Sequence, residues 1–278
     1  MNEMILPLSL IQRTAILTLF CFCVTLGCPC LAQGTRAATP TERSMQSDPT
    51  AIQTMQAALQ QSGGIYKWRG IHSAEMRVTI PPHGKSAPVT LLLLDDWSTL
   101  NTKYRRGFVG KTKTPKDHNG AASFNSKADG TGMTVPEFDQ ARVLADHLPA
   151  AAIEVILRRP EYVVKQSAPG KCPAESLCVD VYRQSYPQGP FVKEQEWIIS
   201  TASGLPASVQ YRLPNLLHSG IETWGKITYK AYSTSSGLQV PSDVEIDIGS
   251  GMKMESQLQS LNLNVPFDTK HFDQEIAQ

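Results

Sequence analysis

The stretch Val244-Glu245-Ile246-Asp247-Ile248-Gly249-Ser250-Gly251, followed by Lys253–Leu263, decides the fold class of this chain. Apolar side chains at 244, 246 and 248 alternate with two carboxylates, and successive residues of a strand point to opposite faces. A strand formed here therefore has one apolar face and one solvated face. The glycines that follow predict a turn into a second strand. The pattern indicates an antiparallel sheet that packs one face against a core.

Similar segments recur through most of the chain upstream, many of them separated by turn signals such as Pro82-His83-Gly84 and Ser236-Gly237. Together with the two strands above, the segments predicted as strands are Met76–Ile80, Val89–Leu94, Thr102–Phe108, Tyr162–Val164, Cys178–Arg183, Glu196–Ile199, Ala207–Tyr211, Lys226–Ala231, Val244–Ile248 and Lys253–Leu263. So many short strands predict a mainly β protein.

A helix is predicted ahead of the first strand. Asp48-Pro49 has the form of a helix cap with proline in the first turn, and Ile52, Met55 and Leu59 lie on one face of the helix that follows. Ser62-Gly63-Gly64 ends it. The apolar stripe of this amphipathic helix requires a partner surface.

Two short helices are predicted in the middle of the chain, over Pro136–Asp146 and Ala150–Leu157. Strands and helices do not alternate regularly, which argues against a parallel doubly wound sheet. The predicted class is therefore α+β, mainly β, with an N-terminal helix and two mid-chain helices.

The first 32 residues have the three parts of a secretory signal peptide. Arg13 precedes the uncharged run Ala15–Leu26, and Cys30-Leu31-Ala32 offers a cleavage site before Gln33. As a helix the run would span about 18 Å, which is short for a hydrocarbon core of about 30 Å. An uncleaved anchor and lipoprotein processing at Cys28 remain the alternatives.

The rest of the chain is predicted to be a flexible linker over 33–48 and one domain over 49–278, because the linker composition cannot bury a core. Twenty-six basic residues against 25 acidic ones leave a net charge of +1, so nothing argues for nucleic acid as a partner. No second hydrophobic run approaches a membrane span. We expect an exported protein, periplasmic and tethered only if Cys28 is lipidated. Its oligomeric state stays open.

Cysteine usage agrees with export. Four of the six cysteines lie in or beside the leader, which leaves Cys172 and Cys178 in the mature chain. In an oxidising compartment such a pair is typical of a disulfide, and a short closed loop of this kind stabilises a fold by about 2 kcal/mol. A redox pair or a metal site would need other spacings or further ligands.

Signatures of catalysis are not found in the sequence. There is no Gly-x-Ser-x-Gly segment, no phosphate-binding glycine motif, and no pair of histidines at helical spacing. The adjacent carboxylates Asp95 and Asp96 would point to opposite faces of a strand, and we expect them to end Val89–Leu94 in a solvated turn. No catalytic residue, metal site or cofactor is predicted.

Three motifs in the last eighty residues resemble one family. In order, they are Ser203–Pro206 with the strand Ala207–Tyr211, then Ile227–Tyr232 with Gly237–Pro241, and finally Leu261–Asn264 with Phe267 and Phe272. Their sequence and spacing are similar to those of periplasmic lipoprotein-carrier-like (LolA-like) domains of the outer-membrane lipoprotein-sorting group. The resemblance implies a strongly curved antiparallel half-barrel whose concave face is covered by the N-terminal helix and the two mid-chain helices.

In such a fold, an apolar cavity between sheet and helices can accept acyl chains. The residues predicted to line it here are Ile52, Met55, Leu59, Trp97, Trp197, Trp224 and Tyr229. Ordinary core packing is the alternative role for the tryptophans. The function predicted is a non-enzymatic module of the cell envelope that binds or carries a lipid or an acylated ligand. The alternatives are an envelope interaction protein with a filled core and a secreted hydrolase with an unrecognised site.

Overall fold

The computed structural model describes residues 45–82, 87–98, 103–109, 122–125, 140–184, 189–213, 223–247, 249 and 253–267, with the backbone alone for 103–109 and 122–125. The chain divides into two units, 1–37 and 38–278, and every described residue lies in the second. The predicted signal peptide and most of the predicted linker therefore lie outside the described residues.

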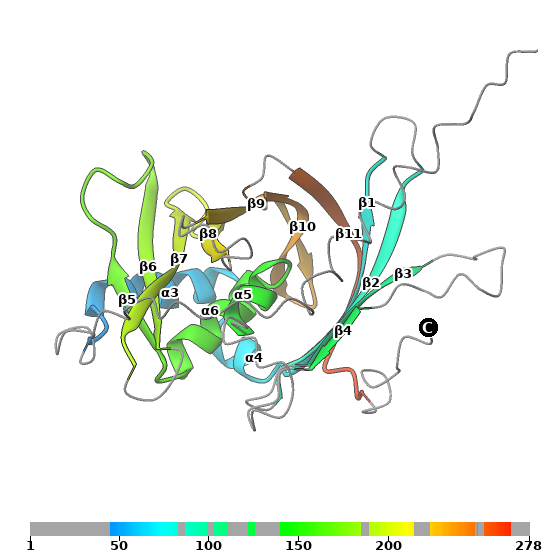
Figure 1. Ribbon diagram of the computed structural model, residues 1–278, viewed down its shortest axis with the longest axis horizontal. Helices are drawn as coiled ribbons and strands as arrows, with labels where there is room; N and C mark the ends of the chain where they lie inside the picture. The colour runs from blue at the N-terminus through cyan, green and yellow to red at the C-terminus, as the bar shows by residue number, and fades with distance from the viewer. Residues whose placement is uncertain are drawn as a thin grey trace, which may run out of the picture. The chain divides into compact units, whose positions relative to one another are not determined.

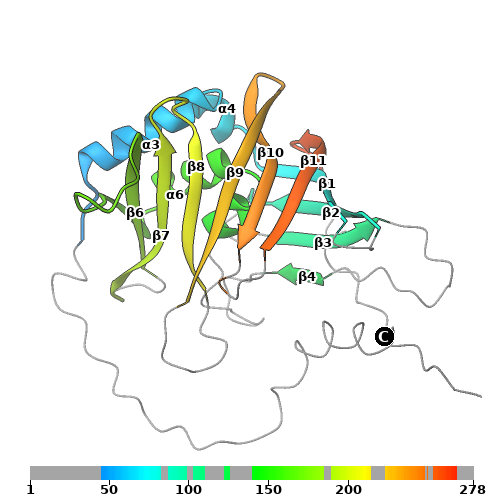
Figure 2. The ribbon, with the colours of Figure 1, turned by 90° about the horizontal axis from the view of Figure 1, so that it is seen from above.

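The strands form one antiparallel, strongly curved and unclosed sheet of 11 strands in the order β4-β3-β2-β1-β11-β10-β9-β8-β7-β6-β5 (Figures 1 and 2). Their bounds are β1 Ser73–Ile80, β2 Val89–Asp96, β3 Lys103–Val109, β4 Ala122–Asn125, β5 Tyr162–Gln166, β6 Ser176–Gln184, β7 Phe191–Ser200, β8 Pro206–Leu213, β9 Thr223–Ser235, β10 Leu238–Asp247 and β11 Lys253–Leu263. Two meanders, β1–β4 and β5–β11, are joined by the pairing of β1 with β11. The predicted fold class is confirmed.

The described residues also form four helices, which are α3 Pro49–Gln61, α4 Ile65–Arg69, α5 Gln140–Ala145 and α6 Pro149–Arg158. The predicted start of α3 is confirmed, since the Thr50 amide donates to the Asp48 carboxylate at 2.8 Å. The described part of the first mid-chain helix begins at Gln140, within the predicted range. Neither α4 nor β4 was predicted, because each is too short to show a period.

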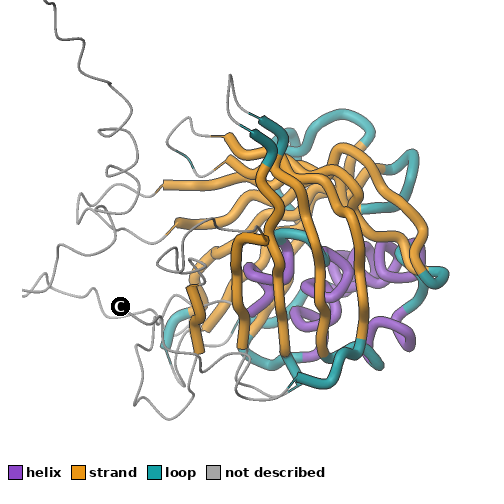
Figure 3. Tube along the Cα trace, turned by 90° about the vertical axis from the view of Figure 1, so that its right-hand side faces the viewer, coloured by secondary structure: helices purple, strands orange, loops and turns teal. Residues whose placement is uncertain are grey.

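The helices gather on the concave face of the sheet (Figure 3). All residues of α6 from Pro149 to Ile156 are buried, as expected of a helix that is enclosed on every side. One face of α3 is buried as well, through Ala51, Met55, Ala58 and Leu59. The described helices include none that is both long and apolar enough to span a bilayer.

The expected solvated turn at Asp95 is wrong. Strand β2 continues through Asp96, and only 1% of Asp95 is exposed. In the ladder, Asp95 lies opposite Ala74 of β1, and Leu93 lies opposite Met76. Alternation therefore places Asp95 on the same face as these buried residues, so the carboxylate is covered together with them.

Two sets of bonds lie near the edge strand β5. The predicted disulfide between Cys172 and Cys178 is confirmed, with 5.6 Å between the Cα atoms. Ahead of α3, the Asp48 amide donates to the Val164 carbonyl at 2.8 Å, and the Val164 amide donates to Ser47 Oγ at 3.1 Å. Because Val164 belongs to the edge strand β5, this segment occupies backbone groups that would otherwise offer a pairing edge.

Candidate functional site

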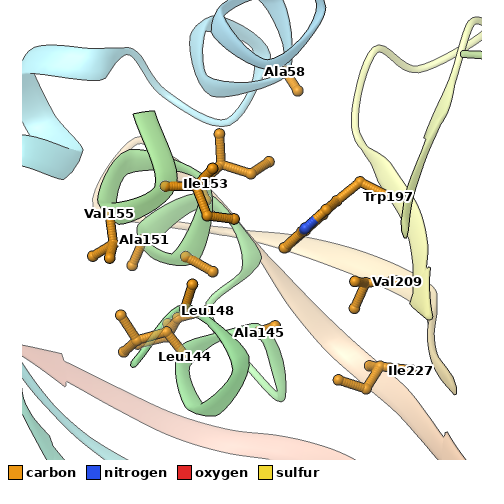
Figure 4. Packing of buried hydrophobic residues seen from close by; sticks show 14 of the residues in the cluster. Ala58, Leu144, Ala145, Leu148, Ala151, Ile153, Val155, Trp197, Val209 and Ile227 are labelled. Atoms are coloured by element: carbon orange, nitrogen blue, oxygen red, sulfur yellow. The ribbon is translucent and has the colours of Figure 1, made fainter. Parts of the chain in front are cut away.

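The space between α6 and strands β7–β9 is filled by side chains. Ile153 of α6, Trp197 of β7, Val209 of β8 and Ile227 of β9 are each 0% exposed, so no water-sized space touches them. Figure 4 shows the Trp197 ring lying between its strand and α6, with Val209 and Ile227 facing the helices from the neighbouring strands. Packing of this kind is that of a core.

The polar atoms in this region are largely paired within it. The Trp197 indole donates to Gln195 Oε1 at 2.8 Å, and the Tyr229 hydroxyl donates to the Ala145 carbonyl at 2.6 Å. The Tyr232 hydroxyl donates to the Pro206 carbonyl at 2.8 Å, and its ring centroid is 6.2 Å from that of Tyr229. Burial raises the pKa of the Tyr229 phenol well above its usual value. The bond of Tyr229 connects α5 to the sheet, and the bond of Tyr232 connects β9 to the start of β8.

A cation is stacked at the edge of the same region. The Arg142 guanidinium of α5 lies 3.8 Å from the centroid of the Tyr211 ring and pairs with Asp146 at 2.9 Å. On the sheet, Tyr211 lies opposite Gly225, and a Cβ on that glycine would come within 2.5 Å of the ring. Glycine at 225 thus allows the tyrosine ring to lie against the backbone, where burial raises the pKa of its hydroxyl.

A side-chain contact connects the loop between α5 and α6 to strand β11, on the same concave face of the sheet. His147 Nε2 lies 3.0 Å from Ser256 Oγ, and both residues are buried. Ser256 lies on the concave face of β11, where most of its neighbours on that face are apolar. The contact therefore marks how far along the sheet the helices reach.

Beyond this contact, the concave face stays apolar but is less covered. Leu258 of β11 lies opposite Val78 of β1, which lies opposite Leu91 of β2, so the three strands present one continuous face. Exposure along β2 rises from the buried Leu93 through the half-buried Leu91 to Val89, which is 36% exposed. We call this region the open strip. It consists of Ile80, Val89, Leu91, Met254, Leu258, Leu261 and Leu263, all at least partly exposed.

Five of the seven residues predicted to line a cavity belong to the buried core: Met55, Leu59, Trp97, Trp197 and Tyr229. A sixth, Ile52, is half-buried and packs against that core.

The structure does not bring Trp224 to this group. Trp224 alternates with Gly225 and Ile227, which face the helices, so it lies on the convex face. There the Lys193 ammonium lies 5.8 Å from its ring centroid. The prediction for Trp224 treated tryptophan as a cavity residue without using the period of its strand. The same period does not reveal the open strip along β11, because a register shift in its pairing with β1 brings Met254 and Leu258 to the same face as Leu261 and Leu263.

We next consider whether the described residues form a metal site or contain an unpaired buried acid. In the described part of the chain, no group of three or more His, Cys, Asp and Glu residues could hold a metal ion. Glu154, the buried acid of α6, accepts from Arg158 at 3.1 Å and from Arg69 at 3.5 Å, which accounts for its charge. The arrangement of the described residues offers an apolar surface.

Neither a family model nor a curated protein matches the sequence. Among solved structures, the chain is similar to a DUF1329 family protein from Desulfovibrio piger, with a TM-score of 0.46 and 11% identity over 84% of this chain and 100% of that one. It is also similar to an outer membrane lipoprotein-sorting protein domain from Vibrio parahaemolyticus, with a TM-score of 0.44 and 12% identity over 81% of this chain and 96% of that one. A LolA superfamily protein from Nitrosomonas europaea matches with a TM-score of 0.43 and 11% identity over 81% of this chain and 97% of that one. Similarity at this level assigns no activity.

Proposed function

We propose that this protein is a non-enzymatic binding module of the cell envelope that holds an acyl chain of a lipid or an acylated ligand along the open strip. The observation that carries the proposal is the partial exposure of an apolar face that continues directly from the core. Val89 and Met254, at one end of the strip, are 36% and 37% exposed. Contiguous apolar surface left in water marks a binding surface more often than scattered single residues do.

The dimensions of the strip suit a long hydrocarbon chain. From Leu258 to Leu263, beyond the contact of His147 with Ser256, β11 rises about 17 Å at roughly 3.4 Å per residue. Each methylene group that leaves water on this surface contributes about 0.8 kcal/mol before the entropic cost of binding. A single acyl chain lying along the strip could therefore reach useful affinity without any charged contact.

The filled core favours a second candidate, an envelope interaction protein. Under α6 the side chains of Trp197 and Ile153 leave no room for a ligand, so an acyl chain would have to bind beside the helices. An exposed apolar strip also fits the surface of a protein partner. The two candidates differ in whether the purified protein takes up a free fatty acid.

The test is fluorescence titration of the purified protein with a fluorescent fatty acid, repeated on Val89→Asp with Met254→Asp. Both positions are already exposed, so the variant retains its fold, and two carboxylates on the strip should raise the dissociation constant at least tenfold. Leu177→Asp is the matched control, because Leu177 of β6 is 42% exposed and lies outside the strip. No uptake by the natural chain, or equal uptake by all three proteins, would remove the proposal.

Residence in the envelope belongs to the same proposal and rests on the leader sequence. Cleavage between Ala32 and Gln33 would release a soluble protein, whereas processing at Cys28 would tether it. N-terminal sequencing and intact mass of the mature protein distinguish these outcomes, and an unprocessed chain found in the cytoplasm would exclude both.

A further inference from the structure

A second surface, on the far side of α3 and α4 from the core, has the form of a binding site. Tyr66 of α4 is 84% exposed, although tyrosine rings are usually at least half covered in folded proteins. Beside it lies a shallow pocket of about 350 Å³ lined by Gln56, Gln60, Ile65, Tyr66 and Arg69. The volume falls in the range of small-molecule sites.

Hydrogen bonds and a buried side chain fix the one-turn helix α4, which carries Tyr66, against the rest of the domain. Trp68 is buried, and its indole donates to the Ser62 carbonyl at 3.0 Å. After the helix, Asn264 Nδ2 donates to the Gly70 carbonyl at 3.0 Å, and the Asn264 side chain accepts from the His72 amide at 2.9 Å. Because the backbone on both sides of Tyr66 is fixed, the exposed ring stands on a rigid support. A ligand that stacks on it would pay little ordering entropy.

The cation in the pocket is also fixed in place. Arg69 Nε lies 3.5 Å from Glu154 Oε1, and the Glu154 side chain is only 4% exposed while that of Arg69 is 53% exposed. Arg158 holds the same carboxylate through two bonds of 3.1 Å. The bond of Arg69 uses Nε, so its terminal nitrogens keep donor capacity for a ligand.

The remaining wall is uncharged. No residue of α3 from Pro49 to Gln61 carries a charge, and Gln56 and Gln60, one helical turn apart, are both exposed. Each carboxamide offers donors and an acceptor from a single group.

We propose that this pocket binds a neutral saccharide of mono- or disaccharide size, with one sugar face on the Tyr66 ring and its hydroxyls paired to Gln56, Gln60 and Arg69. Sugar hydroxyls both donate and accept, and each carboxamide can do both, while the Arg69 guanidinium donates. The C–H face of a pyranose is the part that packs on an aromatic ring. The pocket also contains too little apolar surface for an acyl chain, since Ile65 is its one aliphatic residue. The site is independent of the open strip.

The test is a ¹H–¹⁵N correlation titration of the purified full chain with cellobiose, maltose, lactose and di-N-acetylchitobiose. At least one of these should bind with a millimolar dissociation constant and shift amides within 56–69. Tyr66→Ala should weaken that binding about tenfold or more, from loss of the stacked ring. Its melting temperature should stay unchanged, because the side chain is exposed.

Gln53→Ala is the matched control. Gln53 is a glutamine on the exposed side of the same helix and does not line the pocket, so this variant should bind as the natural chain does. The proposal is overturned if none of the four sugars binds, if the shifted amides lie elsewhere, or if Tyr66→Ala binds as tightly as the natural chain. It is equally overturned if Tyr66→Ala abolishes a protein contact while no sugar binds.

Discussion

The concave face of the sheet has two regions built from the same kind of residue in the same alternating pattern. Under α6, the side chains of β7–β9 are sealed from water, with Trp197, Val209 and Ile227 each 0% exposed. Across β2, β1 and β11, apolar residues on the same face reach 36–37% exposure. Identical strand chemistry thus gives a core in one region and a surface in the other.

The difference follows from the size of the covering elements. α6 has 10 residues and is about 15 Å long. Eleven strands at about 4.8 Å spacing extend for about 48 Å along the curve of the sheet. Short helices cannot cover such a face, and whatever apolar surface they leave becomes available for binding. Three measurements would break or sharpen this contrast.

The largest effect is expected at the two tryptophans on opposite faces of the sheet. Trp197→Ala should lower the free energy of unfolding by about 4 kcal/mol, because it empties a fully packed site and removes the hydrogen bond from the indole to Gln195. Trp224→Ala should cost less than about 1 kcal/mol, since Trp224 lies half-buried on the convex face. Urea denaturation of both variants gives the comparison. Similar costs would mean that Trp224 is part of a core.

Along β2, the gradient of exposure predicts a gradient of stability. Leu93→Ala should cost about 3 kcal/mol, because Leu93 is 2% exposed and packs in the core. Leu91→Ala, two residues along on the same face, should cost about 1 kcal/mol, because that side chain is already in contact with water. Equal losses in urea denaturation would show that the strip is as well covered as the core.

The smallest change in the free energy of unfolding is expected when the buried hydroxyl of Tyr229 is removed. Its pKa in the folded chain is raised by burial, so the stability it contributes is complete below about pH 10 and is lost as the pH rises further. Tyr229→Phe should cost about 1 kcal/mol at neutral pH through the lost bond to Ala145. Above about pH 10 its stability should fall less steeply than that of the natural chain, by up to 1.4 kcal/mol per pH unit.

Urea denaturation at neutral and alkaline pH measures both parts of this prediction. If the free energy of unfolding fell equally steeply above about pH 10 for the natural chain and for Tyr229→Phe, water would have to reach the Tyr229 hydroxyl.

Local patterns predicted much of the fold. The cap at Asp48, the strand of Val244 and Ile246, and the disulfide of Cys172 with Cys178 each depend on neighbours within a few residues, and each is confirmed. The one-turn helix α4 escaped prediction because five residues show no periodicity.

The candidate site was harder to predict, because burial of a side chain depends on contacts from distant parts of the chain. Asp95 was expected in water, and is buried on the same face as Leu93. Trp224 was grouped with Trp197 by residue type, although the period of β9 separates them by the whole thickness of the sheet. Residue chemistry alone did not indicate which face each would occupy.

The sequence by itself therefore determined which segments are strands and, within a stretch of strand that has no bulge, which side chains share a face, because alternation is a property of the extended backbone. Only the tertiary structure decided that β1 pairs with β11 and that the helices cover one region of the concave face while leaving the open strip exposed. The physical reason is that pairing and coverage depend on contacts between residues far apart in the chain, such as His147 with Ser256, which no local pattern encodes.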